Sequence, residues 1–311
     1  MNDPSNDQSV DVAVRGVRFA KTLMAAVWRE LYLSYRFVWR DLSASVIPAL
    51  IFTLVALKSR SQWNFSEVVG ALTRTGVYFW LYIYSFCLAN QLSGLEEDRV
   101  NKPDRPLCAG LVSYRGACWR WVLVTFGFAF VGWRFGALKW ALLWQVCIVL
   151  HNFCGWSKHW FSKNMLVMPA GLVALLAPSW EFVNPLTPLI WRWIITLAIA
   201  VGITINLQDL RDIAGDRRAG RQTLPIAWGE GIARIALSVL FVLLAVTIHY
   251  VLMMPAGHTL TVFLCDGCLV ISNLVIAFRI LICRSPKSDH MTYMLYTYWF
   301  CGLLVSAIFI L

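Results

Sequence analysis

Long apolar runs separated by short polar loops fill the chain from about residue 42 onward. A helix that crosses the roughly 30 Å hydrocarbon core of a bilayer needs about 20 residues, so each run, with some flanking residues, predicts one membrane-spanning helix. Alternating strands joined by hairpin turns are missing from the pattern. We therefore predict an all-α, polytopic membrane protein with nine transmembrane helices. These are expected at about 42–57, 77–89, 118–132, 137–153, 165–180, 188–205, 232–253, 259–282 and 291–311.

The segment before these runs has a different pattern. Between residues 14 and 40, six basic residues are interleaved with aromatic residues and leucines. This pattern predicts an amphipathic helix that lies on the membrane surface. We therefore divide the chain into an amphipathic N-terminal segment, residues 1–40, and a transmembrane domain, residues 41–311.

Composition supports a membrane protein. Of the 311 residues, 59% are hydrophobic and only 14% are charged, whereas a soluble domain has about 25% charged residues. The net charge of +10 can indicate nucleic acid or an anionic surface, but in so apolar a chain it is expected of cytoplasmic loops. We predict a lipid bilayer as the environment and no nucleic-acid partner.

The distribution of charge predicts the orientation of the chain. With the N-terminus inside, the N-terminal segment and the loops after predicted helices 2, 4, 6 and 8 hold 21 of the 27 Lys and Arg residues. Cytoplasmic loops carry such an excess of basic residues. The same orientation places the two richest polar loops on one face of the membrane.

The first of these polar segments, residues 90–106, follows the second predicted helix. Asn90, Gly94 and Asp98 are spaced four residues apart, and Glu97 precedes the last of them. On a helix these residues share one face, and the small Gly94 leaves space between the polar groups.

The second polar segment, residues 206–221, follows the sixth predicted helix. Its acid and amide residues fall on one helical stripe, formed by Asn206, Asp209, Asp212 and Asp216. Ionisable residues at the end of an apolar helix are costly unless they are paired, solvated or bound to an ion. Ordinary cytoplasmic loops with surface ion pairs would not explain two such segments on the same face of the membrane. We therefore interpret them as a functional site.

The ligands offered by both segments suit Mg²⁺. Each segment has carboxylate and amide oxygens without a His or Cys partner, and Mg²⁺ prefers oxygen and is often shared with substrate phosphates. Cations lie among the acids, and carboxylates beside guanidinium groups can hold a diphosphate through metal and direct bonds. These cations are Arg99, Lys102 and Arg105 in the first segment, and Arg211, Arg217, Arg218 and Arg221 in the second.

At these residues the chain resembles the UbiA superfamily of intramembrane prenyltransferases. The first segment is similar to the family's N-D-x-x-D-x-x-x-D motif and continues as Asn-Lys-Pro-Asp-Arg-Pro. The other segment resembles the D-x-x-x-D motif, at Asp212 and Asp216, followed by Gly-Arg-Gln-Thr-Leu-Pro. The resemblance covers most of the chain from about Leu31 onward.

The resemblance implies a helical bundle around a central cavity that opens laterally to lipid. It also implies two or more Mg²⁺ ions that bridge a diphosphate, with catalysis centred on Asn90, Asp98, Asp212 and Asp216. The implied metal ligands are Asn90, Glu97, Asp98, Asp209, Asp212 and Asp216. The implied diphosphate contacts are Lys102, Arg105, Lys158 and Arg221, although Lys158 is equally explained as a basic loop residue that sets topology.

One departure from the family motif points to a branch. Gln91 and Gly94 stand where many prenyltransferases carry Asp, while Glu96 and Glu97 are added just before Asp98. Glu97 is therefore the expected substitute ligand. This form is similar to the branch of membrane-bound terpene cyclases, which implies an active site near the cytoplasmic face and, in a eukaryotic cell, the endoplasmic reticulum.

Our main hypothesis is a class I terpene cyclase that ionises farnesyl or geranylgeranyl diphosphate and cyclises the resulting cation. The alternative is a prenyltransferase that moves the prenyl group to an aromatic or other acceptor, and a transporter without catalysis is the third reading. The 44 aromatic residues are compatible with a cavity that stabilises cations, but also with lipid-facing and interfacial positions. Asp266, in the eighth predicted helix, is expected either to quench a cation or to bond a neighbouring helix.

Overall fold

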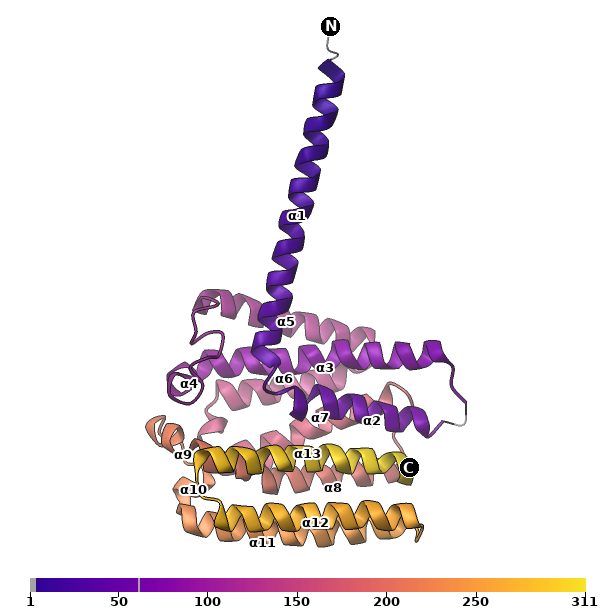
Figure 1. Cartoon of the computed structure of the whole chain (residues 1–311), viewed down its shortest axis with the longest axis vertical. Coiled ribbons are helices and arrows are strands. Elements are labelled where there is room, and N and C mark those ends of the chain that lie inside the picture. The colour runs from indigo at the N-terminus through magenta and orange to yellow at the C-terminus, as the bar shows by residue number, and fades with distance from the viewer. Residues whose placement is uncertain (1–3, 61) are drawn as a thin grey trace.

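Helices make up the folded chain, as the apolar runs predict. The computed structural model describes residues 4–60 and 62–311, with side chains from residue 18 onward apart from residue 61. Within these residues there is no β-strand, only one isolated bridge between His159 and Gln222. The long helices lie side by side in one bundle, and three short helices gather at one end of it (Figure 1). These short helices are α4 (Leu95–Asn101), α9 (Asp209–Arg218) and α10 (Leu224–Ala227).

Each predicted transmembrane segment coincides largely with one long helix. In chain order these are α2 (Val46–Lys58), α3 (Phe65–Ser93), α5 (Tyr114–Arg134), α6 (Leu138–Asn152), α7 (Met168–Glu181), α8 (Pro188–Thr204), α11 (Glu230–Ile248), α12 (Leu260–Ile282) and α13 (Pro286–Ile310). A π-helical turn, Phe161–Val167, leads into α7, and another, His249–Met253, continues α11.

Six helical segments in the described part of the chain are long and apolar enough to cross a membrane: 114–134, 161–181, 188–218, 230–256, 260–282 and 286–310. A seventh is added if α2 and the end of α1, which meet at a bend of 64°, form one span. Helix length and hydropathy therefore support six or seven membrane-spanning helices in the described residues and do not confirm the predicted nine. The helix α6 has only 15 residues, about 22 Å, and the tyrosines and the Asn90-Gln91 end of α3 lower its hydropathy.

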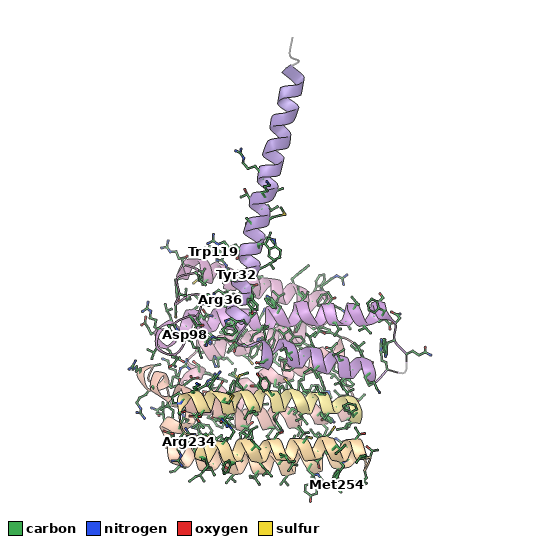
Figure 2. All side chains as sticks on the ribbon, viewed as in Figure 1. Tyr32, Arg36, Asp98, Trp119, Arg234 and Met254 are labelled. Carbon is green, nitrogen blue, oxygen red and sulfur yellow. The ribbon has the colours of Figure 1, made fainter. Side chains whose placement is uncertain are left out.

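Apolar side chains face both the interior and the outside of the bundle. A buried aromatic cluster joins α3, α5 and the end of α7, with Tyr78 4.9 Å from Phe128 and 5.4 Å from Phe182 between ring centroids. On the outer face of α5, large side chains such as Trp119, labelled in Figure 2, are exposed. In water such a surface would be unusual, so lipid is the solvent that these helices fit.

A buried ion pair fixes the helices at the end that carries α9 and α10. Arg234 of α11 donates to both carboxylate oxygens of Asp289 in α13, at 2.9 and 2.8 Å, and to the Ile280 carbonyl of α12 at 3.0 Å. Both charged side chains are only 2% exposed. This contact links three helices and fixes the first turn of α13, which carries residues of the site described next.

The first helix, α1 (Pro4–Val38), projects steeply away from the bundle (Figure 1). Its last turns carry the buried residues Leu33, Phe37 and Val38, whereas Phe19 and Trp28 are exposed. Ion pairs also attach its C-terminal half, because Glu30 bonds Arg120 of α5, and Arg40, just beyond its end, bonds Asp104.

Candidate active site

A cavity of about 730 Å³ opens between the helices. One part of its wall carries charged residues from α4, α9 and the adjoining loops, and another carries aromatic residues from α3, α6 and α13. We call the charged part of the wall the polar pole and the aromatic part the aromatic hollow. Both parts line one continuous cavity.

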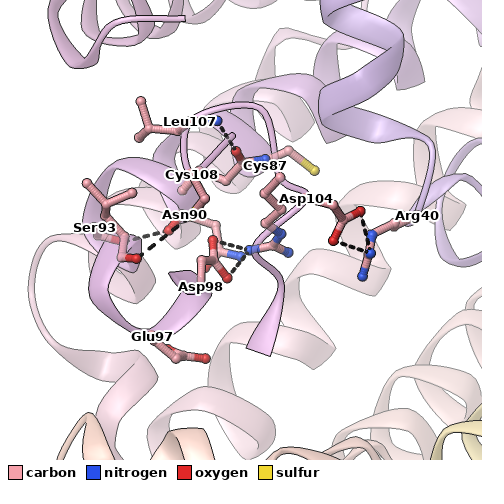
Figure 3. Close-up of polar contacts among 12 residues, drawn as sticks. Arg40, Cys87, Asn90, Ser93, Glu97, Asp98, Asp104, Leu107 and Cys108 are labelled. Atoms are coloured by element: carbon pink, nitrogen blue, oxygen red, sulfur yellow. Dashed lines mark hydrogen bonds and ion pairs between the residues drawn. The ribbon is translucent and has the colours of Figure 1, made fainter. Parts of the chain in front are cut away.

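The first acidic segment turns where α3 ends. Gly94 separates α3 from α4, and a β-carbon at this position would overlap the Asn90 carbonyl, so the turn requires glycine. Asn90 and Glu97 line the cavity. Asp98 does not line it, because its buried carboxylate accepts two bonds from Arg105 Nη1, at 2.8 and 2.7 Å (Figure 3). The structure thus places Asp98 behind Arg105, which does line the cavity.

The second acidic segment begins with a 3₁₀ turn, Ile205–Gln208, and continues as α9. Asp209, Asp212 and Asp216 all line the cavity. The helix α9 approaches α4 closely at Gly215, where any β-carbon would overlap the Asn101 side chain. Glycine at this position therefore lets the two acidic segments meet.

Each acid that these two segments present to the cavity has a cationic partner. Lys163 Nζ lies 2.5 Å from Asp209 Oδ1, and Arg211 Nε lies 3.3 Å from Asp212 Oδ2. Arg221 pairs with Glu97 and lies 3.5 Å from Asp216. Arg221 thereby links the first acidic segment to the second.

The predicted diphosphate contacts are only partly brought together. Lys102, Arg105 and Arg221 line the cavity. Burial lowers the pKa of Lys102, and the neighbouring charge of Arg105 lowers it further, so an anion that binds beside Lys102 would favour its charged form. Lys158 is exposed and is not among the residues that line the cavity.

Lys163 takes the place in the cavity that the sequence suggested for Lys158. It lies in the π-helical turn before α7 and is buried. The next residue, Asn164, donates to Asn206 Oδ1 at 2.7 Å and to Asp209 Oδ2 at 3.2 Å. A lysine beside an asparagine at the start of an apolar run is a signal that could have indicated these residues.

Aromatic rings form the other part of the cavity wall. Tyr82 and Trp144 stack with centroids 4.5 Å apart, and Phe86 stacks against Trp144 at 5.3 Å. The Trp144 indole donates to the Tyr82 carbonyl at 3.0 Å, and the Tyr82 hydroxyl donates to the Gly171 carbonyl at 2.9 Å. These bonds hold the ring faces in place, and the face of an aromatic ring attracts a cation.

A second aromatic group comes from α13, where Tyr293, Tyr296 and Phe300 line the cavity. The Arg211 guanidinium lies 4.4 Å from the centre of the Tyr293 ring and 2.9 Å from His290 Nδ1. Asp266, the other acid noted in the sequence, is not among the lining residues. It pairs with His249 at 2.6 Å, between α12 and the continuation of α11.

The donor atoms at the polar pole fit a hard divalent cation. Asp216 Oδ2 and Asn164 Oδ1 are buried and have no hydrogen-bond partner among the described residues, and carboxylate and amide oxygens are the ligands that Mg²⁺ takes. Within the described residues no three His, Cys, Asp or Glu side chains are grouped closely enough to hold a metal alone. The acids are instead paired with Lys and Arg, so a metal would bind here together with an anion that takes up those cations.

Comparison with known proteins shows that the chain is similar to prenyltransferases and terpene cyclases. The profile of the UbiA prenyltransferase family matches residues 45–301. Somaliensene A/B synthase of Streptomyces somaliensis is 43% identical over 94% of this chain and 97% of its own. The diterpene cyclase eriG of Hericium erinaceus is 35% identical over 91% of this chain and 90% of its own, and the polyprenyl transferase eriF of the same fungus is 32% identical over 91% and 96%.

Solved structures share the fold. A UbiA homolog from Archaeoglobus fulgidus bound to GPP and Mg²⁺ covers 89% of this chain and 99% of its own, with a TM-score of 0.63 at 14% identity. The same homolog bound to DMAPP and Mg²⁺ aligns with a TM-score of 0.60.

Proposed function

The chain belongs to the UbiA prenyltransferase family, and we propose that within it the chain is a class I terpene cyclase acting on farnesyl or geranylgeranyl diphosphate. The observation that carries this proposal is the lining of the cavity, which combines a group of acids and cations with stacked aromatic rings. Terpene synthases among the relatives that match over nearly their whole length support the same activity.

The polar pole is assigned to the diphosphate. We assign Lys102, Arg105 and Arg221 to bind its oxygens, and Lys163 to join them when it leaves Asp209. Two or more Mg²⁺ ions would bind here. The residues assigned to hold them are Asn90, Glu97, Asp98, Asp209, Asp212 and Asp216. To bind a metal ion, Asp98 would first have to break its ion pair with Arg105. When bound, Mg²⁺ supplies positive charge that favours departure of the diphosphate. Among these residues, we assign Asn90, Asp98, Asp212 and Asp216 as the catalytic residues.

The aromatic hollow is assigned to the prenyl chain. Breaking the C–O bond leaves an allylic cation, and the faces of Tyr82, Phe86 and Trp144 stabilise positive charge as it moves along the folded chain. No protein nucleophile is needed, because a double bond of the same chain attacks the cation. The apolar wall also keeps water from capturing the cation early.

An acceptor-using prenyltransferase is the second candidate, favoured by the polyprenyl transferase eriF, which matches over 96% of its own length. It would share the ionisation step and differ in what captures the cation. The need for an added acceptor separates the two activities.

In the membrane, we propose that nine helices of residues 41–311 cross the bilayer, with the N-terminus and the polar pole at the cytoplasmic face. The excess of basic residues in the loops on that side supports this orientation. The amphipathic segment, residues 1–40, would lie along the same surface, and in a eukaryotic cell the membrane would be that of the endoplasmic reticulum.

The test is to incubate membranes containing the protein with farnesyl or geranylgeranyl diphosphate and Mg²⁺, without an acceptor. Hydrocarbons would be identified by gas chromatography with mass detection, and released diphosphate would be measured in parallel. A cyclic hydrocarbon that is missing with the Asp212→Asn variant supports the cyclase. Intact substrate that is consumed only after a phenolic acceptor is added would replace this proposal with the prenyltransferase.

A further inference from the structure

Asp41 is an acid of the cavity that belongs to neither acidic segment. It lies in the turn between α1 and a short 3₁₀ helix, Leu42–Ala44, and lines the same cavity as Tyr293 and Phe300. An Asp before a helix usually accepts a bond from the first backbone N–H groups. Asp41 makes no such bond, so its carboxylate is left for the cavity.

The carboxylate of Asp41 also lacks the partner that the other cavity acids have. Among the described residues, no Lys, Arg or His nitrogen lies within 4.0 Å of it, whereas Glu97, Asp209, Asp212 and Asp216 each have a cation. Its one side-chain hydrogen bond comes from the Cys87 thiol, 3.3 Å from Oδ2. The other oxygen, Oδ1, bonds no side chain in the described part of the chain, and the residue is only partly buried.

A carboxylate that forms no ion pair within 4.0 Å among the described residues can attract a carbocation that approaches it in the cavity. The charge of Asp41 acts on Arg105 of the polar pole and on Tyr293 of α13, so it can act on a cation that moves from the diphosphate toward the aromatic rings. This inference rests on the proposed cyclase activity and adds the residue that ends the reaction.

We propose that Asp41 accepts the proton that terminates cyclisation. A C–H bond next to the cationic carbon breaks, its electron pair forms the new C=C bond, and the proton passes to Asp41 Oδ1. The carboxylic acid returns the proton to water when the hydrocarbon leaves the cavity. Asp266, in contrast, is held by His249 and does not line the cavity.

The experiment compares Asp41→Asn with Asp266→Asn in detergent-solubilised protein whose folding is checked by thermal unfolding. Diphosphate release and hydrocarbon products are measured from the same reaction, with the substrate that the wild type converts. Asp41→Asn keeps the shape and the Cys87 contact but removes the base. We expect diphosphate release within about threefold of wild type, and a fall of about a hundredfold in the main hydrocarbon.

The missing hydrocarbon should be replaced by alcohols from water capture or by products deprotonated earlier, while Asp266→Asn gives the wild-type products. An unchanged product spectrum in Asp41→Asn would overturn the inference and leave the diphosphate as the base. Loss of diphosphate release in a folded Asp41→Asn protein would also overturn it, because Asp41 would then act in ionisation. A wild type that makes no hydrocarbon rejects the proposed function itself, and this inference with it.

Discussion

Lys163 forms a buried ion pair with Asp209, with Nζ 2.5 Å from Oδ1. The two side chains come from the π-helical turn before α7 and from the start of α9, and both are less than a tenth exposed. Lys163 can bind a diphosphate only if it leaves Asp209, and the buried Asp209 carboxylate then needs another positive partner such as a metal ion. Lys163 and Asp209 are therefore expected to part as substrate and metal arrive together.

Lys163→Gln should weaken substrate binding because it removes one charge-assisted bond to the diphosphate. Such a bond contributes about 1.5–3 kcal/mol, so we expect KM to rise about tenfold or more. Lys158→Gln is the matched control, since Lys158 is exposed outside the cavity, and its KM should stay near wild type. Kinetics of diphosphate release check both variants, and equal effects of the two would reject the assignment of Lys163.

Asp98→Asn should destabilise the protein as well as impair it. The change leaves Arg105 with a buried, poorly compensated charge, and breaking a buried pair in this way costs about 3–5 kcal/mol. Thermal unfolding in detergent measures this loss.

The role of Asp98 can be separated from that of a metal ligand by a double variant. If Asp98 acts only by holding Arg105, then Arg105→Gln with Asp98→Asn should need the same Mg²⁺ concentration for half-maximal activity as Arg105→Gln alone. A higher Mg²⁺ requirement in the double variant would instead support metal binding by Asp98.

Gly215→Ala should separate α9 from α4, because the new methyl group would occupy the space of the Asn101 side chain. Forcing extra volume into a packed contact costs about 1–3 kcal/mol, and activity should fall because the two acidic segments move apart. Gly267→Ala in α12 is the control, since no atom of the described residues lies within 4 Å of the position where its β-carbon would stand. Equal activities of the two variants would argue against this contact.

Gly171→Ala should change the preferred chain length of the substrate. Its β-carbon would overlap the Trp144 ring, which must then shift toward the cavity and reduce the space for the prenyl chain. A change of one methylene in a pocket alters discrimination about 10–200-fold, so the ratio of rates with farnesyl and geranylgeranyl diphosphate should rise. Gly171→Ala with Trp144→Phe should restore the ratio, and a ratio unchanged in the single variant would contradict the expected movement.

Much of the fold follows from local pattern. Apolar runs report helices directly because a backbone in lipid must satisfy its own hydrogen bonds, and all nine predicted segments fall largely on helices. The two acidic segments were also visible, because polar residues at helical spacing next to apolar helices have a large energetic cost without a partner. Whether the shorter helix α6 crosses the membrane could not follow from its apolar residues alone.

The sequence by itself determined that this is a helical membrane protein with two acidic segments, since both properties depend on side chains a few residues apart along one helix. Tertiary structure alone decided which charges meet. Lys163 rather than Lys158 enters the cavity, Asp98 is held by Arg105, and Asp41 lines the cavity without an ion pair to any described residue. Lys163 and Asp209 are 46 residues apart in sequence, and the energies of all these charges depend on distance and burial, which only the packing of the bundle sets.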